Sequence, residues 1–337
     1  MALAFTASFS MLSPLGASAE EHHIRLGYLP VTGHAKFFVA QEQGFFAQEG
    51  LKVDLHEFAN SADGIAAVVA GRLDAGAFGT SAPLIHFARG ADLKVIAGVM
   101  GEDAYLITRR ELTGQISGIK DLAGRKVATV RLASGDAILR YELHRAGVDW
   151  RKDLTIYELR NPPAVIQAVR TGQADAGVVW GPHDQRAQAE GLVVVLSSAA
   201  LQPGHPCCRL VVSGSSLEKT EQWQALLRAL LRAERFAARN HDQTVANIRK
   251  YIPLDDELIR STYYRDTLDQ STDPNVSGVS DFWDAVTGAG FVESERDIHD
   301  VFALSFYQSA LEQLAAAEPD EPLWRELLEK LALQEAS

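Results

Sequence analysis

The chain has 337 residues, enough for two domains that each bury a core of their own. With 47% hydrophobic and 23% charged residues, its composition is typical of a soluble globular protein. A net charge of −12 argues against nucleic acid or an anionic membrane as the main partner, because both select for basic patches.

The N-terminal segment MALAFTASFSMLSPLGASA is strongly apolar and ends in Ala17-Ser18-Ala19, the small-x-small pattern of signal-peptidase cleavage. We therefore predict a signal peptide over 1–19, cleaved after Ala19, and a protein that is free in the periplasm. The segment lacks the basic region that usually begins a signal peptide, so the alternative is an apolar helix that stays on the protein. It is too short for a membrane span.

An internal repeat predicts the architecture. The segment SADGIAAVVAGRLDAGAFGTSAP, from Ser61, and the segment PPAVIQAVRTGQADAGVVWGPH, from Pro162, align without a gap at an offset of 101 residues. Each copy has the pattern of strand, loop, helix and strand, with apolar runs too short for helices in the strand positions. Alternating strands and helices predict an α/β fold of two similar lobes, each with a mostly parallel, doubly wound sheet. In such sheets ligands bind at the carboxyl ends of strands, which places the ligand in the cleft between the lobes.

The pattern becomes helical after residue 213. The segment 220–242 has apolar residues at helical spacing, and DPNVSGVSDFWDAVTGAGFV reads as a turn followed by a helix. The C-terminal segment DEPLWRELLEKLALQ is amphipathic and acidic. We expect it to pack on the first lobe, and the alternative is a docking element for a partner.

Several blocks of the chain resemble the nitrate/sulfonate/taurine group of ABC-importer substrate-binding proteins. They run in order from about residue 24 to 292 and include IRLGYLPVTGHAKFFVAQEQGFFAQEGLKVDL, AGRLDAGAFGTSAP, DLAGRKVATV, TGQADAGVVWGPHDQRA and DPNVSGVSDFWDAVTGAGFV. The resemblance implies the two-lobed periplasmic binding protein fold, which closes on a solute and presents it to an ABC permease. It also implies a non-enzymatic monomer that takes a small polar or anionic organic solute, sulfonate-, nitrate- or pyrimidine-like, without a cofactor.

The resemblance also implies the path of the chain. The first lobe would comprise 24–107 and 210–337, and the second lobe 108–209. The chain would cross between the lobes near DAYLITRR and again near CCRLVVSG. Crossover strands of this kind line the back of the cleft and absorb the closure motion.

Four loops should then face the cleft. The first-lobe loops carry His34 before a helix and the hydroxyls of Thr80 and Ser81, a setting that suits an oxyanion at a helix N-terminus. The second-lobe counterparts carry Arg131, Ser134 and Gly135 in one loop and Trp180 and His183 in the other. Each has a structural alternative: hydroxyls can cap helices, Trp180 can belong to the core, and the histidines and Arg131 can be paired or solvated. Gly181 stands where relatives commonly have a glutamate, so that carboxylate contact is missing.

Cys207 and Cys208 are the chain's only cysteines and follow His205-Pro206. A disulfide between neighbours is a poor staple, because their Cα atoms lie about 3.8 Å apart and the bond closes almost no loop. Three interpretations remain open. The thiols are small strand hydrophobes, of which only one reaches the cleft because strand side chains alternate. They form a strained disulfide in the pocket floor. Or they bind a soft metal ion with His205, completed by His34 or His183.

Two further alternatives are weaker. Cleavage after Ala19 would leave Glu20-Glu21-His22, whose amine, amide nitrogens and imidazole suit Cu(II) or Ni(II), although a plain tail is the simpler interpretation. The chain also resembles the yeast-type pyrimidine synthase of thiamin biosynthesis, through the histidine of TGHAKFFVA and a cysteine motif in a comparable place. A lysine for pyridoxal phosphate is not evident in the cleft loops.

Overall fold

The computed structural model describes residues 22–335, so the predicted signal peptide and most of the Glu20-Glu21-His22 motif lie outside the described residues. Within 22–335, no helix combines the length and apolar character needed to cross a membrane.

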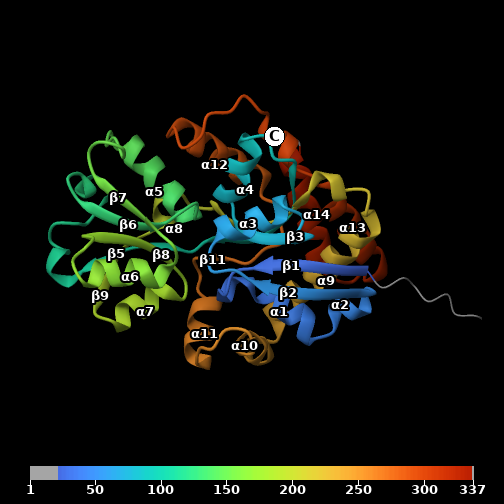
Figure 1. The fold of residues 1–337 in the computed structure, drawn as a ribbon. Helices are drawn as coiled ribbons and strands as arrows, with labels where there is room; N and C mark the ends of the chain where they lie inside the picture. Colours follow the sequence, from blue (N-terminus) through green and yellow to red (C-terminus); the bar gives the residue numbers. More distant parts are fainter. Residues whose placement is uncertain (1–21, 336–337) are drawn as a thin grey trace, which may run out of the picture.

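The described strands form two sheets, of which the first has six strands in the order β11-β4-β10-β3-β1-β2 and the second five in the order β7-β6-β8-β5-β9. The strands of the first sheet are β1 (His22–Tyr28), β2 (Leu51–Glu57), β3 (Ala75–Gly79), β4 (Leu93–Glu102), β10 (Pro206–Ser213) and β11 (Leu268–Asp269). Those of the second are β5 (Ala104–Arg109), β6 (Lys126–Val130), β7 (Thr155–Leu159), β8 (Ala176–Trp180) and β9 (Leu192–Ser197). We call each sheet with its helices a lobe, and Figure 1 shows the two lobes side by side.

Both sheets are mixed, and most strands of each run in one direction, as expected: β1 to β4 in the first sheet and β6 to β9 in the second. β1 pairs parallel with β2 and β3, and β6 pairs parallel with β7 and β8. The crossover strands run the other way: β10 is antiparallel to β3 and β4, and β5 is antiparallel to β8 and β9. Each sheet thus receives from a crossover one strand that runs against its neighbours. The internal repeat contains neither of these crossover strands. The two-lobed α/β architecture itself is confirmed.

The internal repeat is confirmed element by element. Helix α3 (Ser61–Val69) and helix α6 (Pro162–Arg170) begin 101 residues apart, and so do β3 and β8, which begin at residues 75 and 176. Asn60 and Asn161 cap the two helices alike, each accepting a hydrogen bond from a backbone N–H three residues on. After each helix comes a glycine with positive φ, Gly71 at 67° and Gly172 at 77°, a conformation that costs glycine little.

The remaining helices cover both sheets. They are α1 (Ala35–Glu42), α2 (Phe45–Gln48), α4 (Ser81–Ala88), α5 (Ser134–Arg145), α7 (His183–Ala189), α8 (Ser198–Leu201), α9 (Thr220–Arg239), α10 (His241–Arg249), α11 (Asp256–Tyr263), α12 (Val276–Gly288), α13 (Ser305–Ala317) and α14 (Pro322–Glu335). Short 3-10 turns lie at Thr32–His34, Arg110–Leu112, Ile119–Leu122, Gly214–Ser216 and Ile298–Val301.

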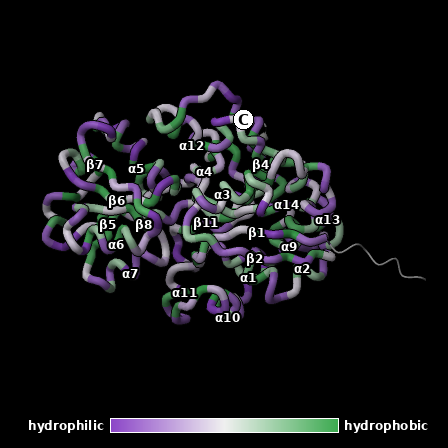
Figure 2. The backbone as a smooth tube through the Cα atoms, viewed as in Figure 1, coloured by the Kyte–Doolittle hydropathy of each residue, from purple (hydrophilic) through white to green (hydrophobic). Residues whose placement is uncertain are grey.

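The C-terminal helices belong to the first lobe. The long helix α9 buries one apolar face, including Trp223 and Leu230, and α14 contributes Trp324, Leu327 and Leu331 to the same core. The predicted packing of the C-terminal segment on the first lobe is therefore confirmed. In Figure 2 hydrophobic residues, in green, gather toward the middle of each lobe, and many outer loops are hydrophilic, in purple, as burial of apolar surface requires.

The chain changes sheets at two places. It leaves the first sheet between Glu102 and Ala104, and it returns between Ser197 and Pro206. Strand β5 spans the expected boundary at 107/108 and lies wholly in the second sheet, whereas β10 spans the boundary at 209/210 and lies in the first. The division into 24–107 plus 210–337 and 108–209 stays a prediction, because strand membership alone does not define a domain.

Candidate functional site

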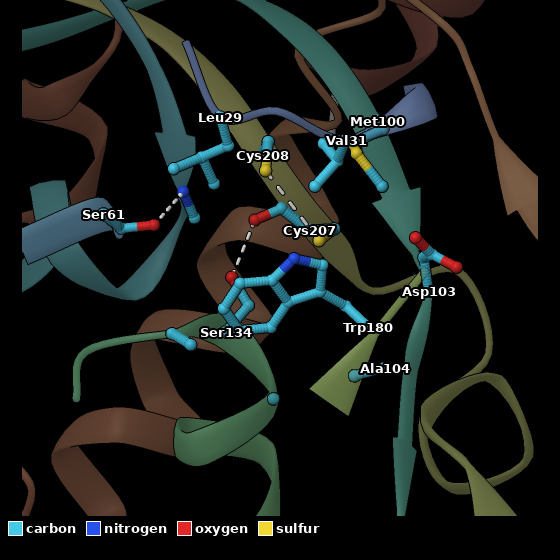
Figure 3. Close-up of a pocket in the computed structure, with 13 residues that line it drawn as sticks. Leu29, Val31, Ser61, Met100, Asp103, Ala104, Ser134, Trp180, Cys207 and Cys208 are labelled. Carbon is cyan, nitrogen blue, oxygen red and sulfur yellow. Dashed lines mark hydrogen bonds between the residues drawn. The ribbon is translucent and has the colours of Figure 1, made fainter. Parts of the chain in front are cut away.

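A cavity lies where the two lobes meet, and residues from both lobes and both crossovers line it (Figure 3). About 390 Å³ of space lies among the lining atoms, part of it open to solvent, and the volume that the centre of a water molecule can occupy is about 30 Å³. Its wall consists of Leu29, Val31, Ser61, Gly79, Met100, Asp103, Ala104, Ala133, Ser134, Gly135, Trp180, Cys207 and Cys208. The wall is mostly apolar, and no lysine or arginine belongs to it. The cavity therefore suits a small solute with an apolar body and few polar groups.

Two helices, one from each lobe, begin at this cavity. Ser61 is the first residue of α3 and Ser134 the first residue of α5. The first backbone N–H groups of a helix lack partners within the helix and carry a partial positive charge. Ser61 Oγ accepts a hydrogen bond from the Gly79 N–H at 3.0 Å, so its own proton can be donated elsewhere. This arrangement favours a hydrogen-bond acceptor on the solute.

Cys207 and Cys208 both line the cavity, which corrects the expectation that only one of them reaches it. The Sγ atoms are 3.9 Å apart, and Figure 3 shows them facing each other. In a regular strand neighbouring side chains point to opposite faces. β10 is not regular here: its register with β4 shifts between Pro206 and Cys208 and again between Cys208 and Arg209. Such irregularities re-aim side chains, and both cysteines are free thiols in the structure.

The carbonyl oxygen of Cys207 joins the two lobes. It accepts hydrogen bonds from the Thr80 backbone N–H (2.8 Å), from Thr80 Oγ1 (3.1 Å) and from Ser134 Oγ of the second lobe (2.7 Å). A second direct contact follows beside it, where Ser81 Oγ donates to the carbonyl of Leu132 at 2.6 Å. The lobes are therefore in contact around the cavity.

Thr80 and Ser81 are fully buried and do not line the cavity. Both hydroxyls donate to backbone carbonyl groups, Thr80 to Cys207 within the first lobe and Ser81 to Leu132 of the second, so Ser81 is the one of the two that links the lobes. Arg131, the remaining candidate of the second-lobe loop, is exposed to solvent. We expected Thr80, Ser81 and Arg131 to contact the ligand. That contact stays a prediction, and the position of these residues outside the cavity wall does not support it.

His34 lies behind the wall rather than in it. It is fully buried, and the backbone N–H of Leu29 donates to its Nδ1 at 3.1 Å. A backbone N–H is always a donor, so Nδ1 is the acceptor and the imidazole proton sits on Nε2. Nε2 has no partner within hydrogen-bond distance. The pKa of Cys208 is lowered, first by a hydrogen bond from Cys207 and also by His34, while the pKa of Cys207 is raised by the same thiol contact and by burial.

Trp180 and His183 differ in their relation to the cavity. Trp180 ends β8 and lines the cavity, and its Nε1 is buried without a hydrogen-bond partner. His183 begins α7, packs edge-on against Trp180 at 6.3 Å between ring centroids, and does not line the cavity. Burial lowers the pKa of His183 to about 4, so this imidazole is neutral at physiological pH.

Sequence reasoning missed Asp103, which lies at the first crossover. Glu102 and Asp103 both have positive φ, 60° and 72°, a backbone conformation that is rare for residues with a side chain and marks this turn as strained. Burial raises the pKa of Asp103 to about 7, although Arg265 opposes the shift. The crossover was expected near DAYLITRR, but nothing local in that segment singles out its first carboxylate.

Arg265 connects Asp103 to the rest of the lobe junction. Its guanidinium lies 3.4 Å from Asp103 and 3.2 Å from Asp184 of α7, and it donates to the hydroxyl of Tyr105. Tyr105 in turn donates to Asp103 at 3.2 Å. Arg265 follows α11 of the first lobe, whereas Tyr105 and Asp184 belong to the second. We call these four residues the hinge cluster.

The other wall residues that the sequence did not single out are apolar or small: Leu29, Val31, Gly79, Met100, Ala104 and Ala133, together with Ser61. The sequence could have pointed to two of them only by their position. Gly79 ends β3 and Ser61 begins α3, at the strand and helix ends where ligands bind.

The structure does not support the predicted soft-metal site of His205, Cys207 and Cys208. Within residues 22–335, no group of three or more histidine, cysteine or acidic side chains is placed so that it could hold a metal ion. His205 is buried, and its ring Nδ1 lies 3.3 Å from the carbonyl of Pro206. The irregular backbone that brings the two thiols together leaves His205 outside the cavity wall. The proposed Cu(II) or Ni(II) site at 20–22 falls mostly outside the described residues.

Comparison with known proteins gives consistent matches. The model of the NMT1-like family matches residues 17–250. A putative binding protein of Brucella abortus is 23% identical over 307 residues, which cover 87% of this chain and 94% of that protein. A putative aliphatic sulfonates-binding protein of Bacillus subtilis is 25% identical over 284 residues, which cover 82% of this chain and 84% of that protein.

Solved structures match as well. The periplasmic nitrate-binding protein NrtA from Synechocystis superposes with a TM-score of 0.76 at 16% identity, covering 88% of this chain and 89% of that one. At this identity the likeness shows the shared fold alone. Together these matches confirm the resemblance that the sequence blocks predicted.

Proposed function

The chain belongs to the NMT1-like family, and we propose that it is the solute-binding component of an ABC importer, which acts in the periplasm without catalysis of its own. Its two lobes would close on a small solute and present it to a permease in the inner membrane, with the binding protein acting as a monomer. The observation that carries this proposal is the cavity, because each lobe supplies part of its wall. The relatives, which are binding proteins, support it.

The cavity also supports a solute class. The N-termini of α3 and α5 and the unpartnered Nε1 of Trp180 all offer hydrogen-bond donors, Asp103 contributes a buried carboxyl group, and most of the remaining wall is apolar. A small polar or anionic organic molecule, with an acceptor group at one end and an apolar body, matches this distribution. The names of the relatives suggest sulfonates and nitrate as the first compounds to test.

Native mass spectrometry of protein purified from the periplasm tests the proposal. We expect a single small co-purified molecule, or saturable binding of a compound from a panel of taurine, alkanesulfonates, nitrate and uncharged pyrimidines. Chemical turnover of a bound compound, or failure of every small-molecule fraction of the periplasm to bind, would contradict the proposal. The same spectrum reports whether a metal ion is retained.

A further inference from the structure

The thiol pair at the cavity has chemistry that solute binding does not use. The two Sγ atoms are 3.9 Å apart, and one reaction partner can approach them from the cavity that both residues line. Cys207 is the more exposed of the two, whereas Cys208 is 3% exposed. Vicinal thiols on the same side of a strand are unusual, because strand side chains alternate, and here the register shifts of β10 bring them together.

His34 prepares this pair for reaction without acting as a base. Since Leu29 donates to Nδ1, the neutral ring carries its proton on Nε2 and can only donate from that side. A doubly protonated ring would place a second N–H against the N–H of Leu29. The pKa of Cys208 is lowered first by the hydrogen bond from Cys207 and further by the nearby imidazole of His34, whose Nδ1 accepts from Leu29 and therefore does not take up the thiol proton. The thiolate is the form of cysteine that attacks a disulfide.

The peptide between the two cysteines is also the peptide that holds the lobes together. Its carbonyl oxygen, that of Cys207, accepts the hydrogen bonds from Thr80 and from Ser134 of the second lobe. A disulfide between neighbours would close a small ring that contains this peptide. The two Cα atoms are about 3.8 Å apart across a trans peptide, less than the roughly 4.4–6.8 Å of a relaxed disulfide, so ring closure has to rotate the peptide and its carbonyl.

From these contacts we propose that Cys207 and Cys208 are a redox modification site, which a disulfide oxidant converts into a vicinal disulfide that breaks the Ser134–Cys207 hydrogen bond and loosens lobe closure. The pair reacts after one of its two protons has passed to solvent, and the remaining proton is shared between the two sulfurs. When that proton lies on Cys208, the more exposed Cys207 thiolate attacks one sulfur of the oxidant and releases its other half as a thiolate. That thiolate takes the proton from Cys208. Cys208 then attacks the sulfur of Cys207, and the second half of the oxidant leaves as a thiolate, which takes up a proton from solvent. The pair has lost two electrons and two protons, one of them to solvent, and the oxidant has become two thiols.

The chemical step is tested with 4,4′-dithiodipyridine on the folded, full-length protein in the absence of solute. We expect release of two pyridinethione molecules per chain, no pyridyl adduct, and a protein mass lower by two hydrogen atoms. A pyridyl adduct that persists on the wild-type protein, or thiols that react only after unfolding, would overturn the proposal.

The Cys208→Ala variant is the matched control. Its reaction should stop after one pyridinethione, and the second pyridylthio group should remain on Cys207. If the variant instead loses its adduct as the wild-type protein does, the second sulfur is not Cys208 and the proposal fails. The parallel experiment on unfolded wild-type protein confirms that both thiols were present at the start.

The effect on closure rests on the proposed function and has its own measurement. We expect the radius of gyration in small-angle X-ray scattering to rise when the wild-type protein is oxidised. Ser134→Ala, which lacks the donor to the Cys207 carbonyl, should show the larger radius when reduced and no further change on oxidation. An unchanged radius in the wild-type protein would overturn the coupling to closure, while solute binding by the reduced protein would still support the proposed function.

Discussion

The two lobes are built from the same repeated unit but present different groups to the cavity. In the first lobe, β3 ends at Gly79, which lines the cavity, and Thr80 follows outside the cavity wall. In the second lobe, the equivalent strand β8 ends at Trp180, whose aromatic ring lines the cavity, and Gly181 follows outside the wall. The repeat preserves the scaffold, and the residues just past the strand ends differ. An asymmetric cavity can therefore arise from two nearly symmetric halves.

The largest effect should come from breaking the contact between the lobes at the hinge cluster. Arg265→Ala would leave the carboxylates of Asp103 and Asp184 buried without their cation, which typically costs about 3–5 kcal/mol. Arg249→Ala is the matched control, because its pair with Asp256 is exposed on the surface of one lobe and should contribute at most about 1 kcal/mol. Urea unfolding of both variants measures the difference. Equal losses of unfolding free energy would show that the hinge cluster stabilises the folded protein no more than an exposed ion pair does.

The hinge cluster should also make stability depend on pH. Asp103 faces Arg265, Asp184, Tyr105 and the backbone N–H of Gly181, and burial raises its pKa from 3.8 to about 7. Its stabilising contribution is complete below about pH 4, where the unfolded carboxyl is also protonated, and is lost as the pH rises to about 7. In the Asp103→Asn variant this loss disappears. The unfolding free energy of the variant relative to wild type should therefore increase with pH by roughly 1.4 kcal/mol per unit over that interval.

Asp136 provides the comparison within one lobe. It is buried in the second lobe beside Arg140, and burial raises its pKa to about 6. The same measurement on Asp136→Asn should show a gain that stops near pH 6 rather than near pH 7. A relative unfolding free energy that does not change with pH in either variant would contradict the assignment of raised pKa values to these carboxyl groups.

The aromatic difference between the lobes predicts a change in solute affinity. Trp180→Ala removes the ring and the Nε1 donor that the second lobe contributes, and loss of an aromatic contact worth about 1.5 kcal/mol weakens binding roughly tenfold. Tyr157→Ala is the control, because this tyrosine is 37% exposed on β7 and does not line the cavity. Isothermal titration with the solute identified by native mass spectrometry measures both. Unchanged affinity in Trp180→Ala would move the solute site away from this cavity.

The smallest effect should reveal the similarity of the lobes rather than their difference. Asn60→Ala and Asn161→Ala each remove a helix cap of the same geometry, and each should cost about 1 kcal/mol of unfolding free energy. Thermal unfolding followed by circular dichroism compares the two variants. A much larger loss in one variant would indicate that the caps of α3 and α6, although alike in structure, do not stabilise the protein equally.

Much of the scaffold was accessible from the sequence because its signals are local. The repeat starting at 61 and 162 predicted α3, α6, β3 and β8, since caps, glycines and apolar spacing describe the backbone of the residues that carry them. The repeat together with the family resemblance predicted five residues that line the cavity: Ser134, Gly135, Trp180, Cys207 and Cys208. The same combination led us to expect ligand contacts from His34, Thr80, Ser81 and His183, and the structure leaves all four outside the cavity wall.

The tertiary structure decided what depends on residues far apart in the chain. The alternation rule failed at Cys207 and Cys208 because a register shift is set by how β10 fits against β4, not by the sequence of β10 alone. Asp103 became notable only when Arg265, far along the chain, packed against it. The sequence by itself determined two similar lobes with a cleft between them. Packing between the lobes determined which groups meet there, because burial and partner distance exist only in the folded chain.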